Sequence, residues 1–465
     1  MACRLSDMIY YLVKQISYII MNIDSILEKL HIESLNKMQL DVAKAMSTTA
    51  DDVVILSPTG SGKTLAYLLP LVFKLNTTVD FLQAVVIVPS RELAKQSVEV
   101  LRSMGVPLRG LALYGGRTAM EEHKEIKKVL PHVVFSTPGR FNDHVSKGNI
   151  NPRSVRFLVL DEFDKCLEMG FEEEMKLVFK SLPLLERRIL LSATRSNEIP
   201  LFVNIDKVSE IDYTEPDSGI SVSDRISNFV VRSPQKDKLE TLSRLLRSFG
   251  NSSSIVFLNY RDSVERTAKY LSEQGFVTST YHGGLEQKDR EDNLYVFSNG
   301  SSTVLVSTDL ASRGLDIPDV DNIIHYHLPQ GEAEYTHRVG RTARWDAVGR
   351  AFVLLGPEEK LPEFVDQELP EYVIPDDLGD IPQPRMATIY IGKGKKDKIS
   401  KSDVLGFLCK KCSLTSNQIG RIDVADRYCY VAVARNKAKQ VLKLANGEKI
   451  KGVKTEFKLK GNSNR

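Results

Sequence analysis

Cysteine is scarce in this chain: five residues occur among 465, and their spacing is uneven. An odd number without regular spacing argues against a disulfide framework and indicates a reducing compartment such as the cytoplasm. Cys409 and Cys412 have the spacing of metal ligands, but no second pair follows them. We therefore expect buried or incidental thiols, with a zinc site as the lesser alternative.

Long hydrophobic runs are absent as well. The first twenty residues contain apolar patches at 9–13 and 16–20, but Lys14 and Gln15 interrupt them and no small-residue cleavage site follows. This pattern fits neither a signal peptide nor a membrane span, so we expect no membrane association. We expect residues 1–20 to be an upstream extension and Met21 to be the functional start, because sequence of the family named below begins only there. An intact-mass measurement on natively expressed protein would test this expectation.

Charge is unevenly distributed along the chain. The net charge is only +3, yet residues 386–465 contain 19 Lys and Arg against 6 Asp and Glu, and the remainder contains 44 against 54. A basic C-terminal module on a mildly acidic body indicates a tethered nucleic-acid anchor. The composition, 42% hydrophobic and 26% charged, is that of a globular protein, and the length predicts about three domains.

A phosphate-binding loop follows the β-branched run at 53–56 and precedes a segment that begins helically. This strand–loop–helix context lets backbone N–H groups and the helix N-terminus face phosphate oxygens. Lys63 would reach the β- and γ-phosphates, and the Thr64 hydroxyl would ligate magnesium. Ser57 stands where the strict motif has its first glycine. The predicted loop consists of Ser57, Pro58, Thr59, Gly60, Ser61, Gly62, Lys63 and Thr64.

Three carboxylates follow another predicted strand, Phe157–Leu160. The segment Asp161-Glu-Phe-Asp164 is costly to place at a buried strand end unless a cation is present. Magnesium bound to a nucleotide would supply that cation, whereas a solvated acidic turn is the alternative for this segment alone. Together with the phosphate-binding loop, it predicts a nucleoside triphosphatase that uses Mg²⁺.

The chain contains two separate series of alternating strand-like and helix-like segments. Each series predicts one parallel α/β domain. The last block has the order β-α-β-β-α-β, the ferredoxin-like layout of an RNA recognition module (RRM). Six prolines and nine acidic residues between 356 and 385 indicate a linker. The predicted domains are an extension at 1–20, an ATP-binding domain at 21–206, a linker at 207–233, a second α/β domain at 234–356, an acidic Pro-rich linker at 357–385, and a small α+β RRM-like domain at 386–465.

The two nucleotide motifs together resemble the DEAD-box family of ATP-dependent RNA helicases, with Phe163 in place of the usual alanine. The resemblance implies two RecA-like domains. It assigns Glu162 as the base that polarises water and Asp161 as a magnesium contact. Coupling of the nucleotide site to strand separation is assigned to Asp164 and to Ser192-Ala-Thr194. Gln39 fits the adenine-reading position by distance, although the usual residues before it are missing, and a solvated helix glutamine is the alternative.

In the second domain, His337-Arg-Val-Gly-Arg-Thr-Ala-Arg344 resembles the family's arginine motif. By resemblance, Arg341 and Arg344 are arginine fingers for the γ-phosphate, and His337 belongs to the coupling residues. Such fingers contribute roughly 10³–10⁵ in rate. Asp309 would pair with an arginine, and Asp316 would sit near the ribose.

Further motifs imply contacts with RNA. Their glycines let the protein backbone approach the phosphates, and their arginines neutralise the phosphate charge. The C-terminal block resembles the RNA-binding domain of the DbpA type, which anchors its enzymes on a hairpin of large-subunit ribosomal RNA. Tyr428 and Tyr430 would share one strand face and stack on bases, or form a half-buried aromatic pair. The predicted RNA-binding residues are Arg91, Gly115, Gly116, Thr137, Pro138, Gly139, Arg140, Arg261, Gly283, Gly284, Gln287, Arg290, Thr308, Lys395, Lys396, Lys398, Tyr428 and Tyr430.

These observations predict a monomeric, cytoplasmic, ATP-dependent RNA helicase that unwinds locally, acts on large-subunit ribosomal RNA and takes part in ribosome biogenesis. An ATP-gated RNA clamp and a DNA helicase or translocase are the alternatives. Duplex unwinding with RNA-stimulated ATPase, RNA binding without turnover, and stimulation by DNA alone would distinguish the three.

Overall fold

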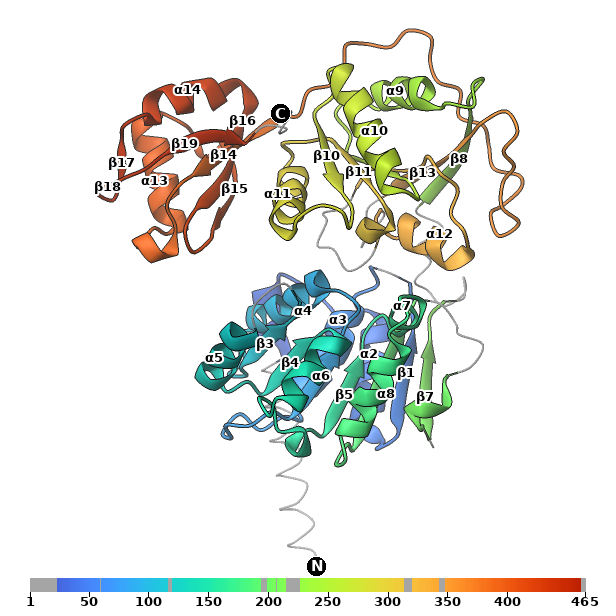
Figure 1. The fold of residues 1–465 in the computed structure, drawn as a ribbon, viewed down its shortest axis with the longest axis vertical. Coiled ribbons are helices and arrows are strands. Elements are labelled where there is room, and N and C mark those ends of the chain that lie inside the picture. The colour runs from blue at the N-terminus through green and yellow to red at the C-terminus, as the bar shows by residue number, and fades with distance from the viewer. Residues whose placement is uncertain are drawn as a thin grey trace, which may run out of the picture. The chain divides into compact units, whose positions relative to one another are not determined.

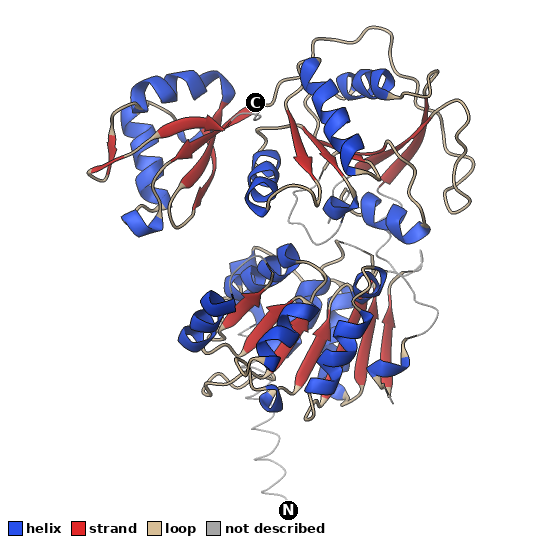
Figure 2. Cartoon of the chain, in the orientation of Figure 1, coloured by secondary structure: helices blue, strands red, loops and turns tan. Residues whose placement is uncertain are grey.

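The structure is a computed structural model of the whole chain, and it describes residues 23–58, 60–115, 119–193, 199–205, 207–214, 226–312, 320–342 and 348–460. The chain divides into two compact units, one N-terminal and one that contains both the second α/β domain and the C-terminal domain. Figure 1 labels the helices and strands, and Figure 2 separates them by colour.

The first unit is built on a seven-stranded parallel sheet of order β3-β4-β2-β5-β6-β1-β7. The predicted strand 157–160 is confirmed as β5, and the strand before the phosphate-binding loop as β1. The elements are α2 (Lys37–Thr48), β1 (Asp52–Leu56), α3 (Lys63–Val72), β2 (Ala84–Ile87), α4 (Arg91–Ser103), β3 (Gly110–Leu113), α5 (Ala119–Val129), β4 (Val133–Ser136), α6 (Pro138–Ser146), η1 (Pro152–Ser154), β5 (Phe157–Leu160), α7 (Phe163–Glu168), α8 (Glu172–Ser181), β6 (Arg187–Ser192), η2 (Leu201–Val203) and β7 (Val208–Asp212).

Helices cover both faces of this sheet, as Figure 1 shows. One core joins the sheet to α2, α3 and α4, and the other joins it to α6, α7 and α8. Because both faces are covered, the strands read as continuous apolar runs rather than as alternating patterns. This burial fixes the strands firmly and leaves their carboxyl ends to carry the polar loops.

The second unit begins with a six-stranded parallel sheet of order β10-β11-β9-β12-β13-β8. The two RecA-like parallel domains of the predicted fold class are therefore confirmed. The elements are β8 (Ile226–Arg232), α9 (Leu239–Ser248), β9 (Ser254–Phe257), α10 (Arg261–Glu273), β10 (Thr278–Tyr281), α11 (Gln287–Ser298), β11 (Val304–Ser307), η5 (Asp309–Ser312), β12 (Asn322–His325), α12 (Glu332–Val339) and β13 (Gly349–Leu355).

Residues 207–233, predicted as a linker without a strong period, contain the edge strands β7 and β8 of the two sheets. An edge strand is only partly buried, so its apolar period is weak and the sequence pattern did not reveal it. The acidic segment after β13 packs against the second sheet. Val230 of β8 pairs with Glu371, and Tyr372 and Ile374 lie against the apolar core.

The C-terminal domain has a four-stranded antiparallel sheet of order β15-β16-β14-β19, backed by two helices (Figure 1). This arrangement confirms the predicted ferredoxin-like layout. Its elements are β14 (Met386–Ile391), η6 (Lys395–Asp397), α13 (Lys401–Lys411), η7 (Ser416–Gln418), β15 (Ile419–Val424), β16 (Cys429–Ala434), α14 (Arg435–Ala445), the hairpin β17 (Lys449–Ile450) and β18 (Val453–Lys454), and β19 (Phe457–Lys460). Across the described part of the chain, no helix combines the length and apolarity that a bilayer crossing requires.

Candidate nucleotide and RNA site

Except for Gln39, which lies on α2 before β1, every predicted site segment of the first unit follows the carboxyl end of a parallel strand, where α/β sheets bind ligands. The nucleotide motifs follow β1, β5 and β6, which are neighbours in the sheet, and the RNA motifs follow β2, β4 and β3, which are the next neighbours. The sheet order therefore places the predicted nucleotide motifs at one half of this edge and the predicted RNA motifs at the other, and we name these the nucleotide half and the RNA half. Sequence order alone does not show this division, because β2, β3 and β4 lie along the chain between β1 and the other two nucleotide strands, β5 and β6.

The phosphate-binding loop joins β1 to α3. Gly60 and Gly62 have φ values of 83° and 87°, the left-handed region that favours glycine. Lys63 Nζ donates hydrogen bonds to the carbonyl oxygens of Ser57 (2.6 Å) and Pro58 (2.9 Å). The Ser57 hydroxyl, at the place of the motif's first glycine, donates to Ser61 Oγ at 2.7 Å. The loop is thus held in a curled form by its own side chains.

Gln39 lies beside this loop and is only 2% exposed. Its Nε2 donates to the Gly62 carbonyl at 3.3 Å, and its Oε1 accepts the Asn36 N–H at 3.0 Å. A Cβ at position 62 would come within 2.5 Å of Gln39 Nε2, so a larger residue there would displace the Gln39 amide from this contact. Asn36 Nδ2 donates to the Ser61 carbonyl at 2.9 Å. Sequence reasoning missed Asn36, although Asn36-x-x-Gln39 is a capping-box signature.

The acidic cluster begins directly at the end of β5. Asp161 is 3% exposed, and burial followed by the charge of Glu162 raises its pKa to about 7, against the opposing charge of Lys63. Glu162 has φ 50°, and its Oε2 atom is buried without a hydrogen-bond partner among the described residues. A buried carboxylate oxygen without a partner and a desolvated neighbour fit a site for a hydrated cation. Thr64 and Asp161 are the residues that would hold magnesium there.

Phe163 replaces a methyl group by a ring, and the structure places that ring in the apolar core. It is 3% exposed and belongs to the cluster that contains Cys166, Met175 and Val178. The substitution is therefore accommodated by packing beneath the strand end. Its acidic neighbours keep their positions at the edge of the sheet.

The coupling segment after β6 lies against the phosphate-binding loop. Ser192 is the register partner of Leu56, and the Ser57 N–H donates to the Ser192 carbonyl at 3.0 Å. Five predicted site residues lie outside the described residues: Thr59, Gly116, Thr194, Asp316 and Arg344.

In the RNA half, Ser90 caps α4 by accepting the Leu93 N–H at 3.2 Å, so serine here keeps the role that a threonine hydroxyl would have. Arg91 is the first residue of that helix. Gly115 is exposed, and a Cβ there would meet nothing within 4 Å. Thr137 and Pro138 begin α6.

Glu122 is a buried carboxylate that sequence reasoning missed. It accepts hydrogen bonds from Arg140 Nε (2.6 Å), His144 Nε2 (2.8 Å) and the Tyr114 N–H (3.1 Å). Burial raises the pKa of Glu122, but the hydrogen bonds of His144, Tyr114 and Arg140 outweigh it and lower the pKa overall. Glu122 thus ties the turn before Gly115 to the arginine of the Thr137–Arg140 segment. A lone glutamate in an exposed-looking helix carries no sequence signal for this role.

A fully buried arginine organises the second unit. Arg338 donates to Asp309 Oδ1 (2.6 Å) and Oδ2 (3.0 Å), to Glu334 (2.6 Å) and to Asn259 (2.9 Å). The expected pairing of Asp309 with an arginine is confirmed. Burial and a hydrogen bond with Asp309 raise the pKa of Glu334 to about 7, against the charge of Arg338. His337 and Arg341, in the same motif, are also buried.

The RNA residues of the second unit also lie at one half of their sheet. They follow β9, β10 and β11, which form its first three strands. A Cβ at Gly284 would lie 3.3 Å from Arg261 Cδ, and Arg290 donates to Gln287 at 2.7 Å. Burial lowers the pKa of His282, and the charges of Arg261 and Arg290 lower it further, against that of Glu265. Thr308 donates its N–H to the Tyr281 carbonyl at 3.2 Å.

Two loops of the C-terminal domain meet in space, and one of them carries a run of lysines. The N–H groups of Lys395 and Lys396 donate to the carbonyls of Ala425 and Asp426, both at 2.9 Å. A Cβ at Gly394 would come within 2.2 Å of the Ala425 oxygen, so only glycine permits this approach. We name the exposed lysines of this loop, Lys395, Lys396 and Lys398, the lysine loop.

Tyr428 and Tyr430 share a face, with ring centroids 5.0 Å apart, as their spacing predicts. Tyr430 is 6% exposed and lies against α11 of the second helicase domain.

Among the described residues, no group of three or more His, Cys, Asp or Glu could hold a metal ion, and Cys412 is buried.

Comparisons with known proteins agree with this geometry. The DEAD/DEAH box helicase model matches residues 36–201, the helicase conserved C-terminal domain matches 237–346, and the DbpA RNA binding domain matches 388–459. The ATP-dependent RNA helicase DbpA of Escherichia coli is 33% identical over 86% of this chain and 89% of that protein. The protein of that name from Bacillus subtilis is 29% identical over 92% of this chain and 95% of that protein. A structure of S. cerevisiae Dbp5 bound to RNA and ADP BeF3 shares the fold, with a TM-score of 0.63 and 24% identity. The match covers 72% of this chain and 88% of that chain.

A phosphate-binding loop and an acidic strand end on one RecA-like sheet, followed by a second such sheet with an arginine motif, define a helicase that hydrolyses nucleoside triphosphates. The matched models and the identity over most of the chain specify the class further. The chain belongs to the DEAD-box family of ATP-dependent RNA helicases and, with its C-terminal domain, to the DbpA type.

Proposed function

We propose that this helicase separates short RNA duplexes locally, as a cytoplasmic monomer, and acts on large-subunit ribosomal RNA during ribosome assembly. The observation that carries the proposal is the division of the first sheet's carboxyl edge into a nucleotide half and an RNA half. ATP and RNA then bind side by side on one rigid sheet, so that a change at one half is transmitted to the other over a short distance.

In the nucleotide half, the curled backbone and Lys63 hold the phosphates, while Gln39 contributes to adenine selection. The buried Glu162 oxygen polarises the attacking water, and Arg341 and Arg344 neutralise charge that develops on the γ-phosphate. Thr64 and Asp161 would hold magnesium, which would offset the negative charge of the phosphates. Asp164 and the 192–194 segment pass the state of this site to the RNA half.

Arginines at the RNA half of the first sheet, and those after β9 and on α11 of the second unit, neutralise phosphates, and exposed glycine turns admit the RNA backbone. Glu122 holds the Arg140 side chain in one orientation. The arginine therefore loses less conformational entropy when RNA binds. His337 also takes part in the coupling between nucleotide and RNA, because it neighbours Arg338 in the buried arginine motif.

The lysine loop supplies the anchor on ribosomal RNA. It projects from a domain of strong positive charge and is backed by the closely packed 425–428 turn. Changing Lys395, Lys396 and Lys398 to Glu should weaken binding to ribosomal RNA and flatten its salt dependence, since fewer counterions are released. The matched control changes three other exposed lysines of the domain, Lys439, Lys443 and Lys449.

The measurement compares ATPase stimulation by ribosomal RNA and by an unrelated RNA of equal length. Loss of the ribosomal preference in the lysine-loop variant alone supports the anchor, whereas equal loss in both variants contradicts it. For the parent enzyme, RNA-stimulated ATPase with duplex unwinding supports the proposed helicase action. RNA binding without turnover would instead support a clamp, and stimulation by DNA alone would support a DNA translocase.

A further inference from the structure

The sheet face of the C-terminal domain packs against α11 of the second helicase domain. Asp292 of α11 is 3% exposed and accepts hydrogen bonds from Tyr430 Oη (2.8 Å) and Lys460 Nζ (2.7 Å). Tyr295, one helical turn further, stacks on Tyr430 with ring centroids 5.1 Å apart. The Tyr295 hydroxyl donates to the Arg421 carbonyl at 3.1 Å.

A second group of contacts lies where α11 ends. Thr388, fully buried, donates to Ser301 Oγ at 2.9 Å and accepts a hydrogen bond from Asn299 Nδ2 at 2.9 Å. Arg435 donates to the Ser301 carbonyl at 3.0 Å. A buried polar network whose members are mutually satisfied specifies one arrangement, because each shifted arrangement leaves a desolvated group unpaired.

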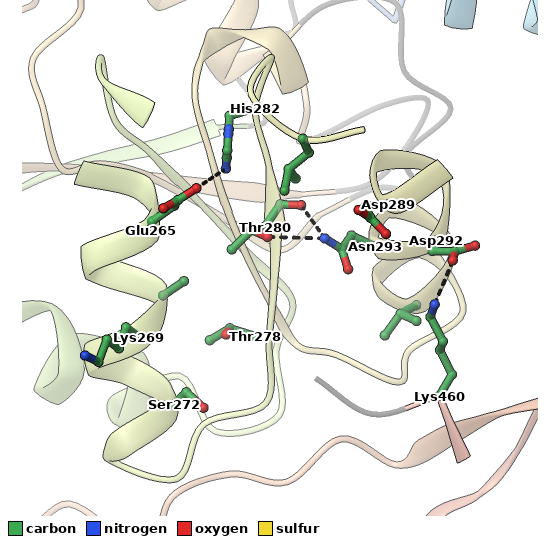
Figure 3. A pocket seen from close by; sticks show the side chains of 13 residues that line it. Glu265, Lys269, Ser272, Thr278, Thr280, His282, Asp289, Asp292, Asn293 and Lys460 are labelled. Atoms are coloured by element: carbon green, nitrogen blue, oxygen red, sulfur yellow. Dashed lines mark hydrogen bonds and ion pairs between the residues drawn. The ribbon is translucent and has the colours of Figure 1, made fainter. Parts of the chain in front are cut away.

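Lys460 also lines a cavity of the second helicase domain. The cavity, of about 480 Å³, lies between α10, β10 and α11, and Figure 3 shows Lys460 reaching Asp292 at its edge. The segment that connects the two domains is itself fixed, since Arg247 Nη2 donates to the carbonyls of Leu378 (2.8 Å) and Gly379 (2.6 Å). A fixed connection lowers the entropy cost of docking the domain that follows it.

We propose that α11 is a permanent mount for the C-terminal domain, with Asp292 as its buried charge centre, so that this domain and the second helicase domain move as one body. Tyr430 then positions the domain instead of stacking on a base. The lysine loop stays outside the mount, and α11 also carries Gln287 and Arg290 at its first turn. The mount would thus set a fixed distance between anchored RNA and the helicase groove, a consequence that rests on the proposed function.

The first test locks the mount in the full-length protein. The Oγ atoms of Ser301 and Thr388 lie 2.9 Å apart, so cysteines at both positions can form a disulfide with little movement. We expect Ser301→Cys with Thr388→Cys to oxidise rapidly without RNA or ATP, whereas Ser301→Cys alone gives no internal cross-link. Absence of the cross-link in the folded double variant would overturn the mount without bearing on the proposed function.

The oxidised double variant then distinguishes a permanent mount from a contact that opens on RNA. Affinity for total ribosomal RNA and the rate of duplex unwinding should agree within about twofold before and after reduction of the disulfide. A loss of tenfold or more in the oxidised state, restored by reduction, would show that the face must open, and would overturn permanence.

A third measurement tests Asp292 itself through the rate of cross-linking. Asp292→Ala leaves Tyr430 and Lys460 without their shared acceptor and should slow cross-linking by roughly tenfold or more. Tyr430→Phe keeps the stacking on Tyr295, loses one hydrogen bond, and should slow it less. Asp289→Ala, at an exposed position on the same helix, is the matched control and should leave the rate unchanged. Equal rates in Asp292→Ala and Asp289→Ala would remove Asp292 from the mount.

Discussion

The two helicase sheets place buried charge at their carboxyl edges in opposite conditions. In the first unit, Asp161 and Glu162 are desolvated, and Glu162 Oε2 has no hydrogen-bond partner among the described residues. In the second unit, the buried Arg338 is neutralised by Asp309 and Glu334 and held by Asn259. We propose that a bound cation and nucleotide complete the first arrangement, whereas the second is complete within the protein.

This difference separates a binding site from a support. Charge that is left uncompensated costs stability and is explained by a ligand, whereas charge that is compensated internally fixes the positions of neighbouring groups. The DEAD-box motifs contain both kinds. Variants of the two kinds should therefore fail in different ways, through turnover in the first unit and through stability in the second.

The largest effect is expected for Glu162→Gln. Removing the base should lower turnover by roughly 10²–10⁴-fold, while ATP and RNA binding persist because the loop contacts remain. Steady-state ATPase and nucleotide-binding measurements check this result. Glu172→Gln, an exposed substitution on the next helix, is the control and should keep full turnover. Hydrolysis by Glu162→Gln at the parental rate would contradict the role of the base.

Arg338→Leu tests the opposite condition. It leaves two partly buried carboxylates without their buried cation, and should destabilise the second unit by about 3 kcal/mol. Urea unfolding followed by the fluorescence of the single tryptophan, Trp345, would measure the shift. Arg266→Leu breaks an exposed ion pair with Asp237 and should cost under about 1 kcal/mol. If the two variants lose the same stability, the contrast between buried and exposed arginine fails.

The raised pKa of Asp161 links the stability of the first unit to pH. A carboxyl whose folded pKa is about 7 keeps its proton in the folded state while the unfolded state has lost it, so stability falls as pH rises from about 4 to 7. Without nucleotide, the Asp161 carboxyl should lower the free energy of unfolding by about 1.4 kcal/mol for each pH unit in that window. Asp161→Asn should remove this slope, as thermal melting at several pH values would show. An unchanged slope would contradict the desolvation of Asp161.

Much of this fold follows from the sequence because apolar runs mark strands that are buried on both faces. The strand 157–160, the β1 loop and the ferredoxin-like order are examples. The edge strands β7 and β8 were not predicted, because partial burial weakens their period. The order of strands within each sheet, which creates the two halves of the site, depends on long-range pairing and leaves no local signal.

The nucleotide site could be predicted because its chemistry needs fixed residue types at short spacing. The partners of Arg140 and Tyr430 could not, since Glu122 and Asp292 meet them only after folding. Glu334, by contrast, precedes Arg338 by one turn of the same helix. Each of these carboxylates lies on a helix surface that faces another element. A helical period predicts such a surface to be polar but does not say what covers it.

Glu122→Gln is the smallest and sharpest test, because Glu122 is a compensated carboxylate within the first unit. Its amide would place a donor against the donors of Arg140 and His144, while the Tyr114 N–H keeps an acceptor. Loss of Arg140's orientation should raise the RNA concentration for half-maximal ATPase about five- to tenfold, or about 1 kcal/mol, and leave maximal turnover unchanged. Glu121→Gln, the exposed neighbour, should change neither value. A fall in maximal turnover at unchanged RNA affinity would assign Glu122 to the nucleotide half and break the division of the sheet edge. The expected split would show that the RNA half of the first sheet, like the second unit, uses compensated charge to position the arginines that meet phosphate.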